Sequence, residues 1–182
     1  RHPQSFRHYL KTHFLDHVPV AEFNSIRGET NNPEAEIARY STLLTAAPID
    51  IISMGIGENG HIAFNDPPVA DFDDPQMIKV VELDPACRQQ QVNDGCFPTL
   101  TNVPRYAFSI TLPAFASAKL LCCIVPSIRK ARAVRDTLTA PIGTACPATL
   151  LRTHPRAELF IDKDAAAEIS NELLKGFGTP IR

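Results

Sequence analysis

The 182-residue sequence lacks the features that mark several large classes of protein. It has no basic excess, since 18 lysines and arginines stand against 20 aspartates and glutamates for a net charge of −2. Nucleic-acid-binding domains are usually basic. No apolar run approaches the roughly 20 residues that a membrane-spanning helix needs, and residues 1–5 lack the charged and then apolar pattern of a secretion signal. We therefore expect no nucleic-acid partner, no membrane partner and no export.

The sequence also lacks the patterns of a disulfide or zinc framework. Its five cysteines are an odd number and include no CxxC pair. Cys122 and Cys123 are adjacent within residues 120–125, which predict a buried strand where reduced thiols behave as small apolar residues. His13 and His17 have chelating spacing on a predicted helix, but no third ligand is evident. We expect free thiols, no metal and a cytoplasmic protein, with disulfide and zinc as the weaker alternatives.

What the sequence does contain is an alternation of helix and strand patterns. Hydrophobic residues make up 44% and charged residues 21%, which excludes wholesale disorder. The periodicity predicts helices over 3–17, 33–46, 84–92, 128–138 and 162–174, and strands over 49–54, 78–81, 107–111, 119–125 and 157–161. This alternation predicts an α/β fold with a mainly parallel sheet and helices on both faces. The strand over 49–54 is nearly all apolar, so we expect it to be buried on both faces.

The candidate functional residues follow that strand directly. Ligands of open parallel sheets collect at the carboxyl ends of strands, and residues 55–67 there read GIGENGHIAFNDP. The glycines, which let the backbone approach a ligand and expose N–H groups, are Gly55, Gly57 and Gly60. His61 can move protons near neutral pH, and the carboxylate of Asp66 can fix its tautomer. From the residues alone, a tight turn with a capped histidine stays open, and the acidic ribose ligand of a dinucleotide site is missing.

Residues 55–67 resemble the signature of the glucosamine-6-phosphate deaminase/isomerase family, G-x-G-x-D/N-G-H-I-A-F-N-E/D-P. Further similarities follow in the same order along nearly all of the chain: HPxSF at 2–6, ExExxxY at 34–40, VPxYA at 103–107, SxxKA at 127–131 and LLRTHP at 150–155. The resemblance implies a Rossmann-like fold shared with 6-phosphogluconolactonase. Residues 1–182 would then form a single α/β domain, about the carboxyl-terminal two-thirds of the family fold.

The resemblance also implies a reaction and roles in it. The family converts glucosamine 6-phosphate to fructose 6-phosphate plus ammonia and needs no redox cofactor. His61 matches the histidine that opens the sugar ring by moving a proton to the ring oxygen, and Asp66 matches its carboxylate partner. Asn59 stands where many members have an aspartate, so this position can accept a hydrogen bond but adds no charge.

For binding, the resemblance implies that the backbone at Gly55 and Ala63 contacts sugar hydroxyls and that Lys130 binds the phosphate. A second phosphate-binding position, an arginine in the family, is Cys96 here, and Arg88 is the candidate replacement. The family's base for the C2 proton is an aspartate upstream of the His-Pro segment. We therefore expect a longer natural protein to supply it.

The sequence leaves the exact function, the amino sugar and the oligomeric state open. A 6-phosphogluconolactonase-like hydrolase is the nearest alternative, although that family continues with small residues such as Ala-Ser where this chain has residues 63–66. A sugar-phosphate-binding protein without catalysis is the alternative from another class. The expected partner is a phosphosugar, while the choice of amino sugar and the formation of a homo-oligomer are undecided, since family members range from monomers to hexamers.

Overall fold

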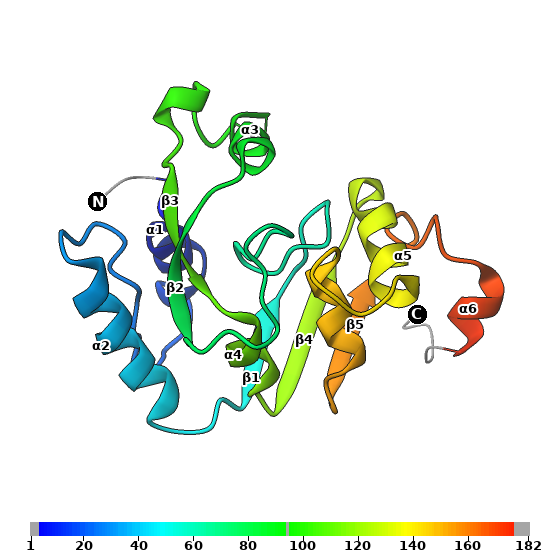
Figure 1. The fold of residues 1–182 in the computed structure, drawn as a ribbon, viewed down its shortest axis with the longest axis horizontal. Helices are drawn as coiled ribbons and strands as arrows, with labels where there is room; N and C mark the ends of the chain where they lie inside the picture. The colour runs from blue at the N-terminus through cyan, green and yellow to red at the C-terminus, as the bar shows by residue number, and fades with distance from the viewer. Residues whose placement is uncertain (1–3, 94, 177–182) are drawn as a thin grey trace. The chain divides into compact units, whose positions relative to one another are not determined.

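The computed structural model describes residues 4–93 and 95–176 (Figure 1). These residues form two compact units. One unit contains residues up to 40 together with 80–108, and the other contains 41–79 together with 109 onward. The expectation of a single domain over 1–182 stays a prediction.

The second unit is built on a three-stranded parallel sheet. Its strands are β1 (Ile51–Met54), β4 (Leu120–Val125) and β5 (Ala157–Ile161), in the order β1-β4-β5. Figure 1 shows β4 between its two neighbours. Alternate residues of β4 are almost fully buried because they enter the core, namely Leu121, Cys123 and Val125.

Short helices supply much of the rest of this core. They are α4 (Leu112–Ala116), α5 (Ala131–Thr139) and the 3-10 helix η4 (Pro147–Arg152). The parallel strand order and these helices in one core confirm the predicted α/β class. The sequence analysis did not predict α4 or η4, because five or six residues are too few to show a helical period.

The predicted burial of β1 on both faces is wrong. Ile52 and Met54 pack against the core cluster, whereas Ile51 is 61% exposed. β1 has a strand neighbour on one side only among the described residues, and its burial alternates along the strand. A nearly all-apolar run therefore does not by itself require both faces to be covered.

The predicted last helix also begins later than expected. Residues 163–168 form turns, and α6 spans Asn171–Gly176. The Asp162 carboxylate accepts the Ala165 N–H at 2.7 Å, while Ser170 accepts the Leu173 N–H at 3.2 Å directly before α6. Ser170, rather than Asp162, is thus the residue that begins the helix.

The first unit contains α1 (Phe6–Leu10), the π-helix η1 (Lys11–Leu15), α3 (Pro85–Asn93) and the 3-10 helix η2 (Leu100–Asn102). The helix α2 (Pro33–Thr45) and the strand pair β2 (Ile78–Glu82) and β3 (Tyr106–Ile110) run from one unit into the other. The predicted start of α2 is confirmed, since Asn32 Oδ1 accepts the Ala35 N–H at 3.0 Å.

A buried carboxylate ties α2 to the segment before it. Glu36 is only 4% exposed and accepts hydrogen bonds from the Arg27 N–H at 2.7 Å and from the Arg39 guanidinium at 2.6 and 2.8 Å. Arg39 in turn donates to the Ser25 carbonyl at 2.8 Å. The hydrogen bonds from Arg39, ahead of the one from Arg27, hold the pKa of Glu36 below its usual value despite burial.

We predict that Glu36→Ala lowers the free energy of unfolding by about 1–3 kcal/mol, because it leaves a backbone N–H and a guanidinium without their acceptor. Urea unfolding monitored by circular dichroism measures the change. Glu34→Ala is the matched control, since Glu34 is an exposed glutamate two residues earlier on α2. Equal effects of the two substitutions would contradict a specific role for Glu36.

Candidate functional site

The loop that follows β1 folds back on itself around His61. The Gly57 N–H donates to the His61 carbonyl at 2.9 Å, and the Gly60 N–H donates to the Gly57 carbonyl at 3.1 Å. A Cβ placed on Gly57 would lie 2.1 to 2.4 Å from three atoms of the His61 ring. Gly57 is therefore required because the imidazole occupies the space of a side chain.

One ring nitrogen of His61 faces two acceptors. Its Nδ1 lies 2.7 Å from Asn59 Oδ1 and 3.0 Å from Asp66 Oδ1. The orientation of the Asn59 amide is fixed at both ends, because Oδ1 also accepts the His61 N–H at 3.0 Å and Nδ2 donates to Asp66 at 2.8 Å. Two acceptors around Nδ1 place the proton on that nitrogen. Nε2 then carries the lone pair that can take up a proton.

Asn59 is suited to bridging His61 and Asp66. A carboxylate at position 59 could accept from His61 but could not donate to Asp66 unless it were protonated. Asn59 does both, so the amide joins the histidine to the buried Asp66 without adding a second negative charge. Asn59, His61 and Asp66 thus form one hydrogen-bond network.

The Asp66 carboxylate is charged although it is buried. Its side chain is 5% exposed, and this burial alone would raise its pKa. The hydrogen bonds from His61 and Asn59, together with the charge of the imidazolium, outweigh burial and hold the pKa of Asp66 below its usual value. The carboxylate is therefore available at neutral pH to stabilise a protonated His61.

The depressed pKa of Asp66 predicts a pH-dependent contribution to stability. A carboxyl whose pKa is lower in the folded state stabilises the fold above its unfolded value, about 3.9. This contribution disappears as the pH falls through the folded-state pKa. We expect Asp66→Asn to destabilise the protein at pH 7 and to have a smaller effect at pH 3. Urea unfolding of both proteins across this range measures the difference, and parallel stability curves would contradict the prediction.

The backbone of the loop is held in less common conformations. Gly60 has φ +78° and Ala63 has φ +52°, in the left-handed region. The Gly60 carbonyl accepts the Ala148 N–H at 2.8 Å, and a Cβ on Gly60 would lie 2.5 Å from the Cys146 sulfur. The start of η4 therefore supports the turn that carries His61.

Asn65 is a structural residue of this loop that the sequence analysis missed. It is fully buried, and its Nδ2 donates to the carbonyls of Ile62 at 2.8 Å and Ile110 at 2.7 Å. The neighbouring Phe64 N–H donates to Ser109 Oγ at 3.1 Å. These bonds fasten the loop to the end of β3. The sequence signal for this structural role is an amide residue, Asn65, that stands between an apolar residue and an acidic one.

Lys130 lies at the carboxyl end of the adjacent strand. β4 continues through Ser127 into the 3-10 helix η3 (Ile128–Lys130), which α5 follows. β1 and β4 pair in parallel, so this turn and the loop over 55–66 meet at one edge of the sheet. An ion pair of 4.0 Å between Arg129 and Glu58 joins them. A Cβ on Gly55 would lie in ordinary van der Waals contact with the Ile124 carbonyl, at 3.4 Å.

The two residues considered for a further phosphate contact lie in the first unit. Arg88 donates through Nη2 to the carbonyls of Leu100 at 2.7 Å and Val103 at 3.0 Å, which fastens α3 to η2. Cys96 is half-buried. A role of Arg88 toward phosphate stays a prediction.

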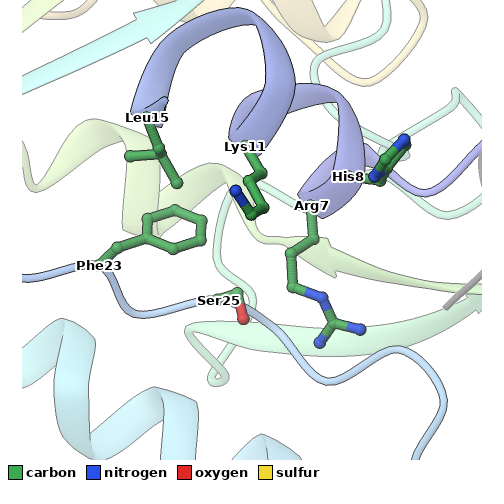
Figure 2. Close-up of a pocket in the computed structure, with 6 residues that line it drawn as sticks. All are labelled: Arg7, His8, Lys11, Leu15, Phe23 and Ser25. Carbon is green, nitrogen blue, oxygen red and sulfur yellow. The ribbon is translucent and has the colours of Figure 1, made fainter. Parts of the chain in front are cut away.

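A cavity of about 280 Å³ lies elsewhere in the first unit (Figure 2). Its lining side chains come from α1, η1 and the segment after them: Arg7, His8, Lys11, Leu15, Phe23 and Ser25. None of the predicted site residues lies there. The two cations already have carboxylate partners, Glu29 for Arg7 at 2.6 Å and Asp16 for Lys11.

The cysteines are all free. Burial raises the pKa of Cys123 to about 12 and also raises that of Cys146. These two thiols are therefore poor nucleophiles at neutral pH.

Within residues 4–93 and 95–176, no group of three or more histidine, cysteine or acidic side chains is arranged to hold a metal ion. No helix of this part of the chain has the length and apolarity to cross a membrane.

Comparison with known proteins gives the family. The sequence profile of the glucosamine-6-phosphate isomerases/6-phosphogluconolactonase family matches residues 1–161. The chain belongs to this family. It is 34% identical over 171 residues to a glucosamine-6-phosphate deaminase of Exiguobacterium sibiricum, covering 94% of this chain and 66% of the relative. A deaminase of Listeria welshimeri is also 34% identical, over 91% of this chain and 68% of its own length.

Solved structures of the family agree with the fold. A monomeric glucosamine-6-phosphate deaminase of the NagB superfamily superposes with a TM-score of 0.84 at 30% identity, over 92% of this chain and 68% of that one. A 6-phosphogluconolactonase from Shewanella baltica gives 0.63 at 13% identity over 88% of this chain and 67% of its own, a likeness of fold alone. The family resemblance and the Rossmann-like α/β prediction are confirmed. This chain spans about two thirds of the length of these relatives.

Proposed function

We propose that the protein containing this chain converts an amino-sugar 6-phosphate, with glucosamine 6-phosphate as the first candidate, to a ketose phosphate plus ammonia. The observation that carries the proposal is the arrangement at His61. Asn59 and Asp66 hold the proton on Nδ1, and Nε2 is left as the base of a ring that the charged Asp66 contacts on its Nδ1 side. The deaminases among its relatives support the same reaction.

In this proposal His61 acts at ring opening. The C1–O5 bond of the sugar breaks, the C1 hydroxyl loses its proton and the ring oxygen gains one. The imidazole takes the first proton on Nε2 and delivers a proton to the ring oxygen. Asp66, 3.0 Å from Nδ1, stabilises the imidazolium between these two transfers. No cofactor is needed for such proton movements.

The same proposal assigns binding roles at the edge of the sheet. The backbone at Gly55 and Ala63 contacts sugar hydroxyls, while Gly57 and Gly60 leave room for the His61 ring and the Cys146 sulfur that shape the loop. Lys130 pairs with the phosphate, close to the first turn of α5. The base for the C2 proton comes from the part of the family fold that precedes the His-Pro segment. We further propose a cytoplasmic protein, consistent with five free cysteines, and leave homo-oligomer formation to measurement.

The test is ammonia release from glucosamine 6-phosphate by the full natural reading frame and by these 182 residues side by side. We expect activity in the longer protein only. A parallel incubation with 6-phosphogluconolactone distinguishes the hydrolase alternative, because only a lactonase releases acid from it. No turnover in either assay, with a raised melting temperature in the presence of glucosamine 6-phosphate, would replace the proposal by a binding role.

A further inference from the structure

Ser127 has a backbone conformation that is unusual for a residue with a side chain. Its φ is +91° and its ψ is +143°, in a region that glycine adopts readily and other residues avoid. Ala63 is the only other non-glycine residue in the described ranges with a positive φ. Both residues lie in the two turns that make up the candidate site. Such a conformation persists only where surrounding contacts hold it.

The contact that holds Ser127 comes from the next strand. Asp162 is the first residue after β5, and its two carboxylate oxygens accept the Ser127 N–H at 3.0 and 3.2 Å. The same carboxylate accepts the Ala165 N–H at 2.7 Å, which fixes its own position. Val125 is paired with Ile161 in the parallel register of β4 and β5, so the ends of the two strands lie side by side.

The turn held in this way is the turn that carries Lys130. The Ser127 carbonyl accepts the Lys130 N–H at 3.0 Å, and Ser127 Oγ caps η3 by accepting the Arg129 N–H at 3.5 Å. Arg129 also forms the 4.0 Å ion pair with Glu58 in the loop of His61. A change in the Ser127 backbone would therefore reorient η3 and displace Lys130.

We propose that Asp162 is a positioning residue for the phosphate end of the substrate. It keeps Ser127 in its left-handed conformation and thereby fixes Lys130 and the first turn of α5 for an anion. Asp162 acts through Ser127 and does not itself touch the phosphosugar. This inference rests on the proposed function, because it assigns Lys130 to the phosphate.

The test compares Asp162→Ala with wild type in the full natural protein. We expect the KM for glucosamine 6-phosphate to rise about tenfold with a smaller change in kcat, as for a loss of uniform binding. Inhibition by inorganic phosphate should weaken in parallel. Adding Ser127→Gly to Asp162→Ala should restore much of the affinity, because glycine adopts this φ without support. Asp164→Ala, which removes an exposed carboxylate two residues further on, should leave the KM unchanged.

Calorimetric titration with inorganic phosphate separates this inference from the proposed reaction. Phosphate binding that weakens in Asp162→Ala and returns in the double variant supports the inference, whatever reaction the protein catalyses. Equal phosphate binding by wild type and Asp162→Ala, or no phosphate binding by wild type, overturns it. Asp162→Asn retains one acceptor and should show an intermediate loss, so it replaces Asp162→Ala if that variant does not fold.

Discussion

Replacement of His61 by alanine is expected to lower ammonia release by the full natural protein by about 10³-fold, the usual range for loss of a positioned acid–base group. The reason is geometric: the His61 ring has its Nδ1 held by Asn59 and Asp66 and presents Nε2 as the base. Steady-state assays with glucosamine 6-phosphate measure the effect. The fold should persist, because the bonds of Asn65 to the Ile62 and Ile110 carbonyls hold the loop independently of His61.

His154→Ala is the matched control for this variant. His154 is buried, its Nε2 lies 2.8 Å from the Ala118 carbonyl and its Nδ1 accepts the Arg156 N–H at 3.1 Å. Both ring nitrogens bond to backbone groups, so its loss should lower the melting temperature while the remaining folded protein keeps its turnover. Near-wild-type rates in His61→Ala would show that the assignment of the ring-opening step is wrong.

Gly57→Ala is expected to lower kcat by about 100-fold or more with little loss of stability. The added methyl group would lie 2.1 to 2.4 Å from the His61 ring, which no real contact permits. Because the end of a side chain moves more easily than backbone, the imidazole should rotate away and lose its bonds to Asn59 and Asp66. Steady-state kinetics measures the loss of turnover.

A change in the His61 environment can be followed by the nuclear magnetic resonance signals of its ring. Gly143→Ala is the control for Gly57→Ala, since a Cβ at Gly143 would meet no atom within 4 Å. It should leave kcat and KM unchanged. Full activity of Gly57→Ala together with unchanged ring signals would contradict the close packing of Gly57 on His61.

Much of the fold follows from local patterns in the sequence. Asn32 followed by Pro33 begins α2 as predicted, because an amide cap and a fixed φ are local properties. The strand over 119–125 appears as β4, since β-branched and apolar residues form a short run between turn residues. The start of α6 was misplaced, because Asp162 accepts the Ala165 N–H as a helix cap does, yet residues 163–168 form only turns and the helix begins after Ser170.

The candidate site was predicted as a set of residue types. The segment over 55–66 places an imidazole, an amide and a carboxylate within one loop, and this spacing is visible in the sequence. Which nitrogen of His61 meets Asn59, and that Asn59 also donates to Asp66, depends on side-chain orientations. Those orientations are set by the folded loop and by the bonds of Asn65 to Ile110, 45 residues away.

By itself, the sequence determined the family, the α/β class and the chemical groups of the loop, because each depends on residue type and local spacing. Only the tertiary structure decided which groups meet. Ser127 and Asp162 are 35 residues apart, and neither has a local signal that points to the other. They come together because β4 and β5 pair in parallel with Val125 opposite Ile161. Such pairing depends on long-range burial of the sheet, which local spacing does not encode.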